Sequence, residues 1–377
     1  MIQLSAFSLF EKKSTFGSVY VILIVNRLQL LYFLFITPMF LVQPYMIWAI
    51  IAVGILSQLN LVLLSKWFTS NFAAMGYQGF VKLLGERTVR FFAFIGLFPI
   101  LIKIVVTTLH YVGTISQFIF PSMKISWLIF FVFGISCFVA SHGMENTIRF
   151  VVIAYLCVFW MILLFFYPFF TPPIAALHDL YPLIPTEWSL HSWYALLFLW
   201  SAFSGPEYLI CLTPWLDNNQ KMLKYLTIGN ILTLLEYLIV FIASLFFFGS
   251  NYLSKTNYPV VNMVRFLQSP IFERIDIILI SVDLFHFVFN IAILLLFFYG
   301  ATRISLKRLE KQTTPIGLIS IYVAIFVFMF ILQKWFWRPG TSDINIWVTI
   351  EMWSGAFTYL LVPAFLMIAI RRKGRVQ

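Results

Sequence analysis

Seven ionisable side chains lie inside apolar stretches of this 377-residue chain. They are Arg27, Lys103, Glu207, Glu236, Asp276, Asp283 and Glu351. A charge at the centre of a bilayer costs about 2.5–3.5 kcal/mol on insertion scales, so such residues usually face the interior of a helix bundle, pair with one another and mark a functional site. The alternative is that they only hydrogen-bond between helices and bind no ligand.

One of these charges stands beside helix breakers. The stretch WSAFSGPEYLICLTPWL (200–216) starts and ends like a membrane helix, but Ser204, Gly205, Pro206 and Glu207 lie in its middle. Gly and Pro weaken a helix, and Pro also removes a backbone donor. Free backbone N–H and C=O groups are tolerated at membrane depth only where they line a cavity or bind a ligand. The stretch therefore predicts a ligand site, or else a Pro kink whose Glu is satisfied by a neighbouring helix.

Two other apolar stretches carry polar stripes. With 100° per residue, one stripe covers an arc of about 80° and consists of Asp276, Asp283, His286 and Asn290. The second covers about 60° and consists of Lys103, Thr107, His110 and Thr114. We expect the stripes to face each other or a watery cavity. The histidines are single on each helix and the three cysteines lie in apolar runs, so we expect no metal site and no cofactor.

The composition indicates a polytopic membrane protein. The chain is 62% hydrophobic and 10% charged, with a mean hydropathy of +0.94, whereas soluble domains average about 25% charged residues. Ten apolar runs, each predicted to be a helix, cover about 17–38, 44–65, 89–117, 125–141, 147–170, 192–213, 223–249, 274–300, 316–334 and 345–370. Short interfacial helices are expected within 70–87 and 258–274. The first 16 residues lack an apolar core and a cleavage site, so we expect no cleaved signal peptide.

The distribution of basic residues predicts the orientation. With the N-terminus in the cytoplasm, 17 Lys and Arg residues fall in inside segments and 6 in outside loops. This asymmetry favours both termini inside and an even number of spans. The net charge of +11 is then explained by the membrane topology and by attraction to anionic membrane lipid. No nucleic-acid partner is therefore expected.

Ten helices divide into two sets of five. Residues 1–377 would then form a single transmembrane domain with inverted repeats at about 17–170 and 192–370, as in many secondary transporters. Span six becomes the counterpart of span one, and span eight the counterpart of span three.

Under this pairing, opposite charges occupy equivalent positions. Arg27 and Glu207 are 180 residues apart, and so are Lys103 and Asp283. These charges would surround one central site. The predicted ligand-binding residues are Asn26, Arg27, Lys103, Ser204, Gly205, Pro206, Glu207 and Asp283.

Several segments resemble a known family. The most specific is NYPVVNMVRFLQSPIFERIDIILI (257–280), supported by GPEYLICLTPWL (205–216), HGMENTIRF (142–150) and LYPLIP (180–185). Along most of its length the chain resembles the B subunit of bacterial spore germinant receptors, within the amino acid–polyamine–organocation transporter superfamily. Glu207 matches the family's Gly-x-Glu position, with Gly205 as its glycine, and Asp276 matches its Arg-Ile-Asp.

The resemblance implies an all-α, LeuT-like fold of about ten membrane helices. It also implies a germinant-binding role in the spore inner membrane, beside a larger A subunit and a lipoprotein C subunit. The ligand that it implies is a small-molecule germinant, with an amino acid as the expected class.

The chain also departs from the family. No glycine lies between Gly17 and Gly54, where relatives carry a Gly-rich break, so span one is expected to be less unwound. Asp283 stands where an apolar or aromatic residue is expected. Arg27 is predicted either to neutralise Glu207 across an empty site or to hold a ligand carboxylate by bidentate hydrogen bonds.

These residues and the resemblance are compared with three possible functions. The preferred one is a non-enzymatic receptor subunit that triggers germination on binding a small nutrient. The alternative is a proton-coupled amino-acid transporter, because carboxylates at the membrane midplane suit proton coupling. An enzyme is not expected: HDLYP and SHGME place His near acids, but no Ser-His-Asp, Cys-His or phosphate-loop arrangement stands out.

Overall fold

The described part of the chain is a bundle of helices. The computed structural model describes residues 9–10, 19–170, 177–184, 190–216, 221–266, 273–309, 313–337 and 345–374. Eight helical stretches in these ranges are long and apolar enough to cross a membrane, and two shorter apolar stretches, Val19–Phe35 and Ile125–Ser141, bring the number to ten. All ten predicted spans fall on these stretches. The predicted all-α polytopic fold is therefore confirmed.

The crossings form two sets of five. The first set is α1 (Val19–Asn26) with α2 (Leu30–Phe40), α3 (Met46–Phe68), α5 (Glu86–Phe118), α6 (Ile125–Ser141), and α7 (Met144–Phe159) continued by the 3₁₀ helix η2 (Trp160–Phe166) and α8 (Tyr167–Phe170). The second set is α9 (Leu190–Ala202) with η4 (Pro206–Tyr208) and α10 (Leu209–Leu212), then α11 (Met222–Leu253), α13 (Ile275–Ser305), α14 (Pro315–Trp335) and α15 (Ile346–Gly374). The short connecting helices are η1 (Ala73–Met75), α4 (Tyr77–Leu84), η3 (Leu177–Leu180), η5 (Thr213–Trp215) and α12 (Pro259–Arg265).

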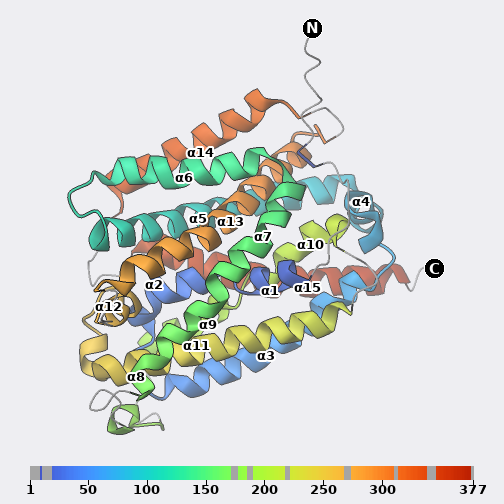
Figure 1. Cartoon of the computed structure of the whole chain (residues 1–377). Coiled ribbons are helices and arrows are strands. Elements are labelled where there is room, and N and C mark those ends of the chain that lie inside the picture. The colour runs from blue at the N-terminus through green and yellow to red at the C-terminus, as the bar shows by residue number, and fades with distance from the viewer. Residues whose placement is uncertain are drawn as a thin grey trace.

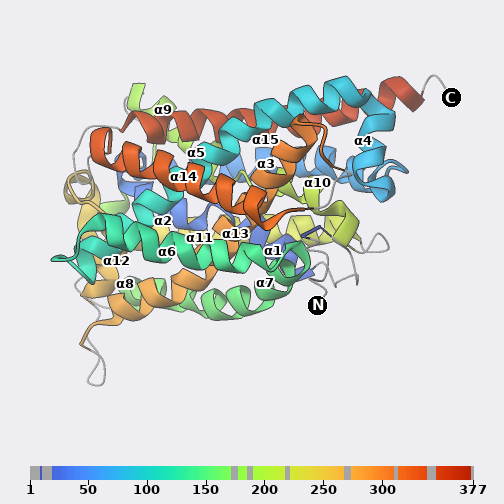
Figure 2. The ribbon, with the colours of Figure 1, turned by 90° about the horizontal axis from the view of Figure 1, so that it is seen from above.

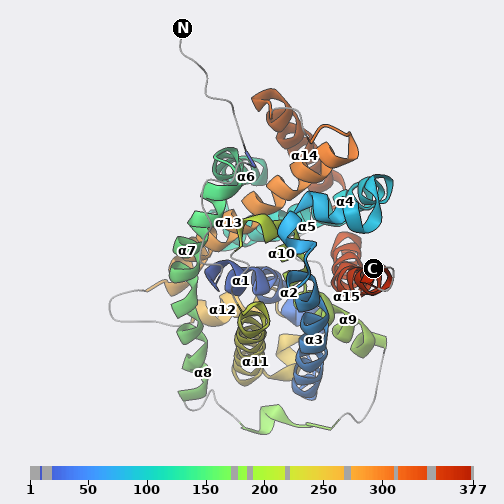
Figure 3. The ribbon, with the colours of Figure 1, turned by 90° about the vertical axis from the view of Figure 1, so that its right-hand side faces the viewer.

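The long helices run roughly side by side, with α8 and α12 at one end of the bundle and α4 and the last turns of α15 at the other (Figure 1). The helices predicted within 70–87 and 258–274 are thus present as α4 and α12. Viewed along the bundle, α1 and α2 lie in the middle (Figure 3). In contrast, α6 and α14 lie together at the upper edge of the bundle in Figure 1 and face the viewer in Figure 2.

Span one is broken, although it contains no glycine. The helix stops at Asn26 and restarts at Leu30, and the turn between them is held by tight bonds such as Leu30 N to Arg27 O at 2.9 Å. Side chains of other helices bind its carbonyls: Asn290 donates to Leu28 O at 3.1 Å, and Thr233 donates to Asn26 O at 3.4 Å. Neighbouring polar groups, rather than glycine, stabilise this break. That span one is less unwound than in relatives stays a prediction.

Span six is broken where the sequence predicts it, and the two breaks touch. Gly205 adopts φ +141°, a conformation that L side chains rarely take. A Cβ at this position would lie 2.5 Å from Val25 O and 3.0 Å from Leu28 Cβ. At the end of α9, the carbonyl of Ala202 accepts a 2.6 Å bond from the Tyr237 hydroxyl. The absence of a side chain at Gly205 therefore lets the backbones of spans one and six approach each other.

The other equivalent spans also pack in pairs. The third span, α5, lies along the eighth, α13, and the second, α3, lies along the seventh, α11. Together with the contact between the first and sixth spans, these pairings are those expected of two related halves around one axis. The repeat boundaries themselves stay a prediction.

The contact at Gly205 gives a test of the fold. Gly205→Ala should lower the free energy of unfolding by about 1–3 kcal/mol, because the new Cβ meets Val25 O and φ is positive. Gly134→Ala, on α6, is the matched control, since its Cβ would meet nothing within 4 Å. The measurement is the thermal unfolding midpoint of the purified protein in nanodiscs. Equal midpoints for the two variants would contradict the close contact of spans one and six.

The predicted orientation can be tested at two exposed positions, Lys255 near α12 and Gln78 on α4. In a cysteine-free background, Lys255→Cys should react with an impermeant thiol reagent added outside intact cells, because the basic residues favour the α4 end inside. Gln78→Cys should react only after the cells are permeabilised. The reverse labelling would invert the orientation.

Candidate functional site

The predicted site residues come from four elements and are all buried. Asn26 and Arg27 stand at the break in span one, and residues 204–207 form the break in span six. Lys103 lies on α5 and Asp283 on α13, and each is at most 3% exposed. The structure gathers these residues around the two breaks and places Lys103 and Ser204 in one cluster and Arg27 and Asp283 in another. Asn26 belongs to neither cluster, since its side chain donates to Ile22 O of its own helix at 2.9 Å.

The first, here called the Lys103 cluster, consists of Lys103, Gln29, Ser204 and Glu351. Lys103 Nζ donates to Ser204 Oγ at 2.9 Å and lies 3.8 Å from Glu351 Oε1. Gln29 Nε2 reaches the same two side chains, at 3.3 Å and 2.8 Å. The ammonium group also lies 5.3 Å from the centre of the Tyr208 ring. This cluster ties both breaks to α5 and α15.

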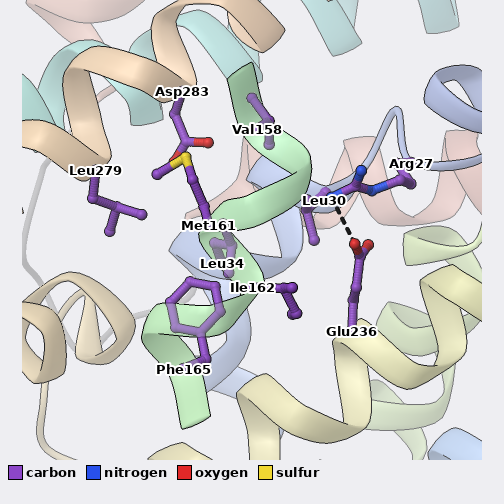
Figure 4. Close-up of a pocket in the computed structure, with 10 residues that line it drawn as sticks. All are labelled: Arg27, Leu30, Leu34, Val158, Met161, Ile162, Phe165, Glu236, Leu279 and Asp283. Atoms are coloured by element: carbon purple, nitrogen blue, oxygen red, sulfur yellow. Dashed lines mark ion pairs between the residues drawn. The ribbon is translucent and has the colours of Figure 1, made fainter. Parts of the chain in front are cut away.

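The second, here called the Arg27 cluster, consists of Arg27, Glu236 and Asp283. Arg27 Nη2 and Glu236 Oε1 form a buried ion pair at 2.6 Å, and the guanidinium lies 5.8 Å from the Tyr155 ring centre. Figure 4 shows these three charged residues around a cavity whose other lining side chains are apolar. The space open to the centre of a water molecule is about 10 Å³, room for roughly one water.

The predicted pair of Arg27 with Glu207 was wrong. Arg27 binds Glu236 instead, and Glu207 Oε2 accepts a 2.6 Å bond from the backbone N–H of Gly205. Thus Glu207 satisfies the break on its own span, and the cation of span one is satisfied by α11. Equal spacing along the chain placed both residues near the centre but did not decide which partner each would take.

Several buried polar atoms at the breaks have no hydrogen-bond partner among the described residues. The acceptors of this kind are Glu207 Oε1, Glu236 Oε2, Glu351 Oε2 and Asn290 Oδ1. Unpartnered donors lie there too, namely Arg27 Nε and the hydroxyl groups of Tyr32, Ser201 and Tyr208. An unsatisfied buried polar atom costs about 1–3 kcal/mol, so a partner that hydrogen-bonds to these atoms would stabilise the core.

The polar stripes have mixed roles. On α13, Asn290 binds the break of span one, whereas Asp276 pairs with Arg274 at 2.6 Å at the helix start. On α5, His110 Nδ1 and Thr114 Oγ1 bind carbonyls of their own helix at 3.0 Å. Among the described residues no group of His, Cys, Asp and Glu could hold a metal ion.

Two members of the Lys103 cluster, Gln29 and Glu351, are not among the ligand-binding residues predicted from the sequence. Glu351 is one of the seven ionisable residues in apolar stretches, whereas Gln29 carries no charge. The signal that could have found Gln29 is its place two residues after Arg27 in an otherwise apolar run. For Glu351 the signal is the free-energy cost of burying a carboxylate in the membrane, because this cost requires a cation or a hydrogen-bond donor as partner.

Comparison with known proteins places the chain in a family. The family described as spore germination protein matches residues 45–335. The spore germination protein GerQB of Bacillus cereus is 24% identical over 268 residues, which are 70% of this chain and 68% of that protein. A crystal structure of a manganese transporter from Eremococcus coleocola, in complex with an aromatic bis-isothiourea compound, aligns over 97% of this chain and 82% of its own, with 12% identity and a TM-score of 0.44.

The family match covers most of the chain and includes eight of its ten crossings, from α3 to α14. It confirms the resemblance seen in the sequence, and the apolar helices make the protein an integral membrane protein. This chain belongs to the spore germination protein family.

Proposed function

We propose that the chain is the germinant-binding membrane subunit of a spore germination receptor. It binds a small nutrient, an amino acid according to the sequence resemblance, and triggers germination without catalysing a reaction. The same resemblance supports its place in the spore inner membrane with both termini on the core side, beside an A subunit and a lipoprotein C subunit. Family membership supports the link to germination.

The observation that carries the binding role is the meeting of two broken helices at buried charges. The breaks at Arg27 and Gly205 are in backbone contact, and two ion pairs lie beside them. Buried oxygens without hydrogen-bond partners and a small cavity lie near these breaks. Both features lower the free energy of unfolding. A ligand that forms hydrogen bonds with these atoms would recover that stability, so the protein would respond to it.

Transport coupled to protons is the second candidate. It is favoured by Asp283, which is 3% exposed and has no hydrogen bond or ion pair with the described residues, so it could carry a proton. The receptor proposal expects no accumulation of labelled amino acid by proteoliposomes that contain this chain alone. Accumulation driven by a pH gradient, and abolished by Asp283→Asn, would favour the transporter.

The ion pair gives a test of the receptor role in spores. Arg27→Gln and Glu236→Gln should each reduce the amount of protein, because removing one partner of a buried pair costs about 3–5 kcal/mol. The double variant carries no unpaired charge, so its level should recover while the germination response to nutrient stays impaired. Protein level is read from immunoblots and germination from the release of dipicolinic acid.

The matched control is Glu86→Gln, which removes an exposed pair with Lys307 at 3.8 Å and should change neither readout. A double Arg27/Glu236 variant that germinates like the parent would mean that the pair is only structural, and it would count against the proposed site.

A further inference from the structure

The cavity of the Arg27 cluster has an unbalanced charge. Its charged lining consists of one guanidinium, Arg27, and two carboxylates, Glu236 and Asp283. Arg27 is already bound to Glu236 at 2.6 Å. Asp283 interacts electrostatically with Arg27 but forms no hydrogen bond or ion pair with the described residues, and the Oε2 atom of Glu236 has no hydrogen-bond partner among them. Burying a carboxylate without a partner is costly, so this cavity is complementary to a positive charge.

The rest of the cavity is apolar. Its lining includes Val158, Met161, Phe165 and Leu279, and Figure 4 shows their side chains around the space into which Asp283 points. An occupant must therefore combine a charged group with a hydrocarbon body. A sugar or a nucleoside would leave hydroxyl groups unsatisfied against these side chains.

One wall of the cavity has an unusual backbone. Met161, Ile162 and Phe165 belong to η2, a 3₁₀ helix of seven residues that continues α7 within the fifth crossing. Such helices rarely exceed three or four residues, and a 3₁₀ stretch inside a longer helix often marks a hinge. Because the cavity has room for roughly one water, a larger occupant must displace a wall, and the 3₁₀ helix η2 is the wall that we expect to move.

We propose that this cavity binds a small organic cation, with its ammonium group on Asp283 and its apolar body against η2. This inference rests on the proposed function and narrows the nutrient to ligands of net positive charge. A zwitterionic amino acid adds no net charge and leaves the excess carboxylate uncompensated. A monocation balances it.

The test uses four probes that share an isobutyl group and differ in charge: isoamylamine, leucine, isoamyl alcohol and 4-methylpentanoate. Each is titrated into the purified full-length chain in nanodiscs, and the ligand-induced rise of the thermal unfolding midpoint gives Kd. Isoamylamine should bind most tightly. Asp283→Asn should weaken its binding about 10- to 100-fold, the effect of losing one hydrogen bond to a charged group.

Two further variants make the result specific. Asp276→Asn, on the same helix but paired with Arg274 away from the cavity, should keep the parent Kd for isoamylamine. Val158→Phe keeps Asp283 and fills the apolar side, so it should also abolish binding, which covers the case that Asp283→Asn fails to fold.

Three results would overturn the inference. The first is binding of isoamyl alcohol or leucine as tight as that of the amine, which would mean that Asp283 is protonated or that Arg27 takes a ligand carboxylate. The second is an unchanged Kd in both Asp283→Asn and Val158→Phe. The third is no effect of the amine at millimolar concentration. None of these affects the germination test of the Arg27 and Glu236 variants, so the proposed function can fail or stand independently.

Discussion

The fold depends on one backbone contact, where Gly205 of span six lies against the carbonyl of Val25 in span one. Each of these helices leaves peptide groups unpaired where it breaks, and hydrocarbon cannot satisfy them. Tyr237, Thr233 and Asn290 supply the missing bonds from α11 and α13. The surrounding helices therefore need polar residues on their inner sides. As a result, side chains that could also bind a ligand lie at the centre of the bundle.

The charges buried around the two breaks follow a simple division between the two sets of crossings. The cations there, Arg27 and Lys103, come from the first five, whereas Glu207, Glu236, Asp283 and Glu351 come from the second five. The ion pairs of Arg27 and Lys103 therefore each join one set to the other. In a low dielectric these pairs hold the sets together, but removing a partner is costly. Carboxylates outnumber cations around the breaks, and this excess of negative charge is the basis for proposing a positively charged ligand.

Much of the fold could be predicted from the sequence, because each crossing is an apolar run and the break at Gly205–Pro206 is local chemistry. The break at Arg27 could not, since nothing within span one disrupts its helix and the stabilising bonds come from residues more than 200 positions away. The free-energy cost of placing a charge in the membrane was enough to predict which ionisable residues are buried near the centre. Their pairing depends on which faces of α5, α11 and α15 turn inward, and helical period alone does not determine that.

The closed centre also bears on how binding could become a signal. A ligand shifts a conformational equilibrium only if it binds one state better than the other. Here the pair between Arg27 and Glu236 and the pair between Lys103 and Glu351 both stabilise the state with little free space. A ligand large enough to displace η2 must compete with the packing of that state, so it favours a different arrangement of the two sets of helices. Span one carries Arg27 on the short turn between α1 and α2, so a displacement at the cavity acts directly on the junction of these two helices.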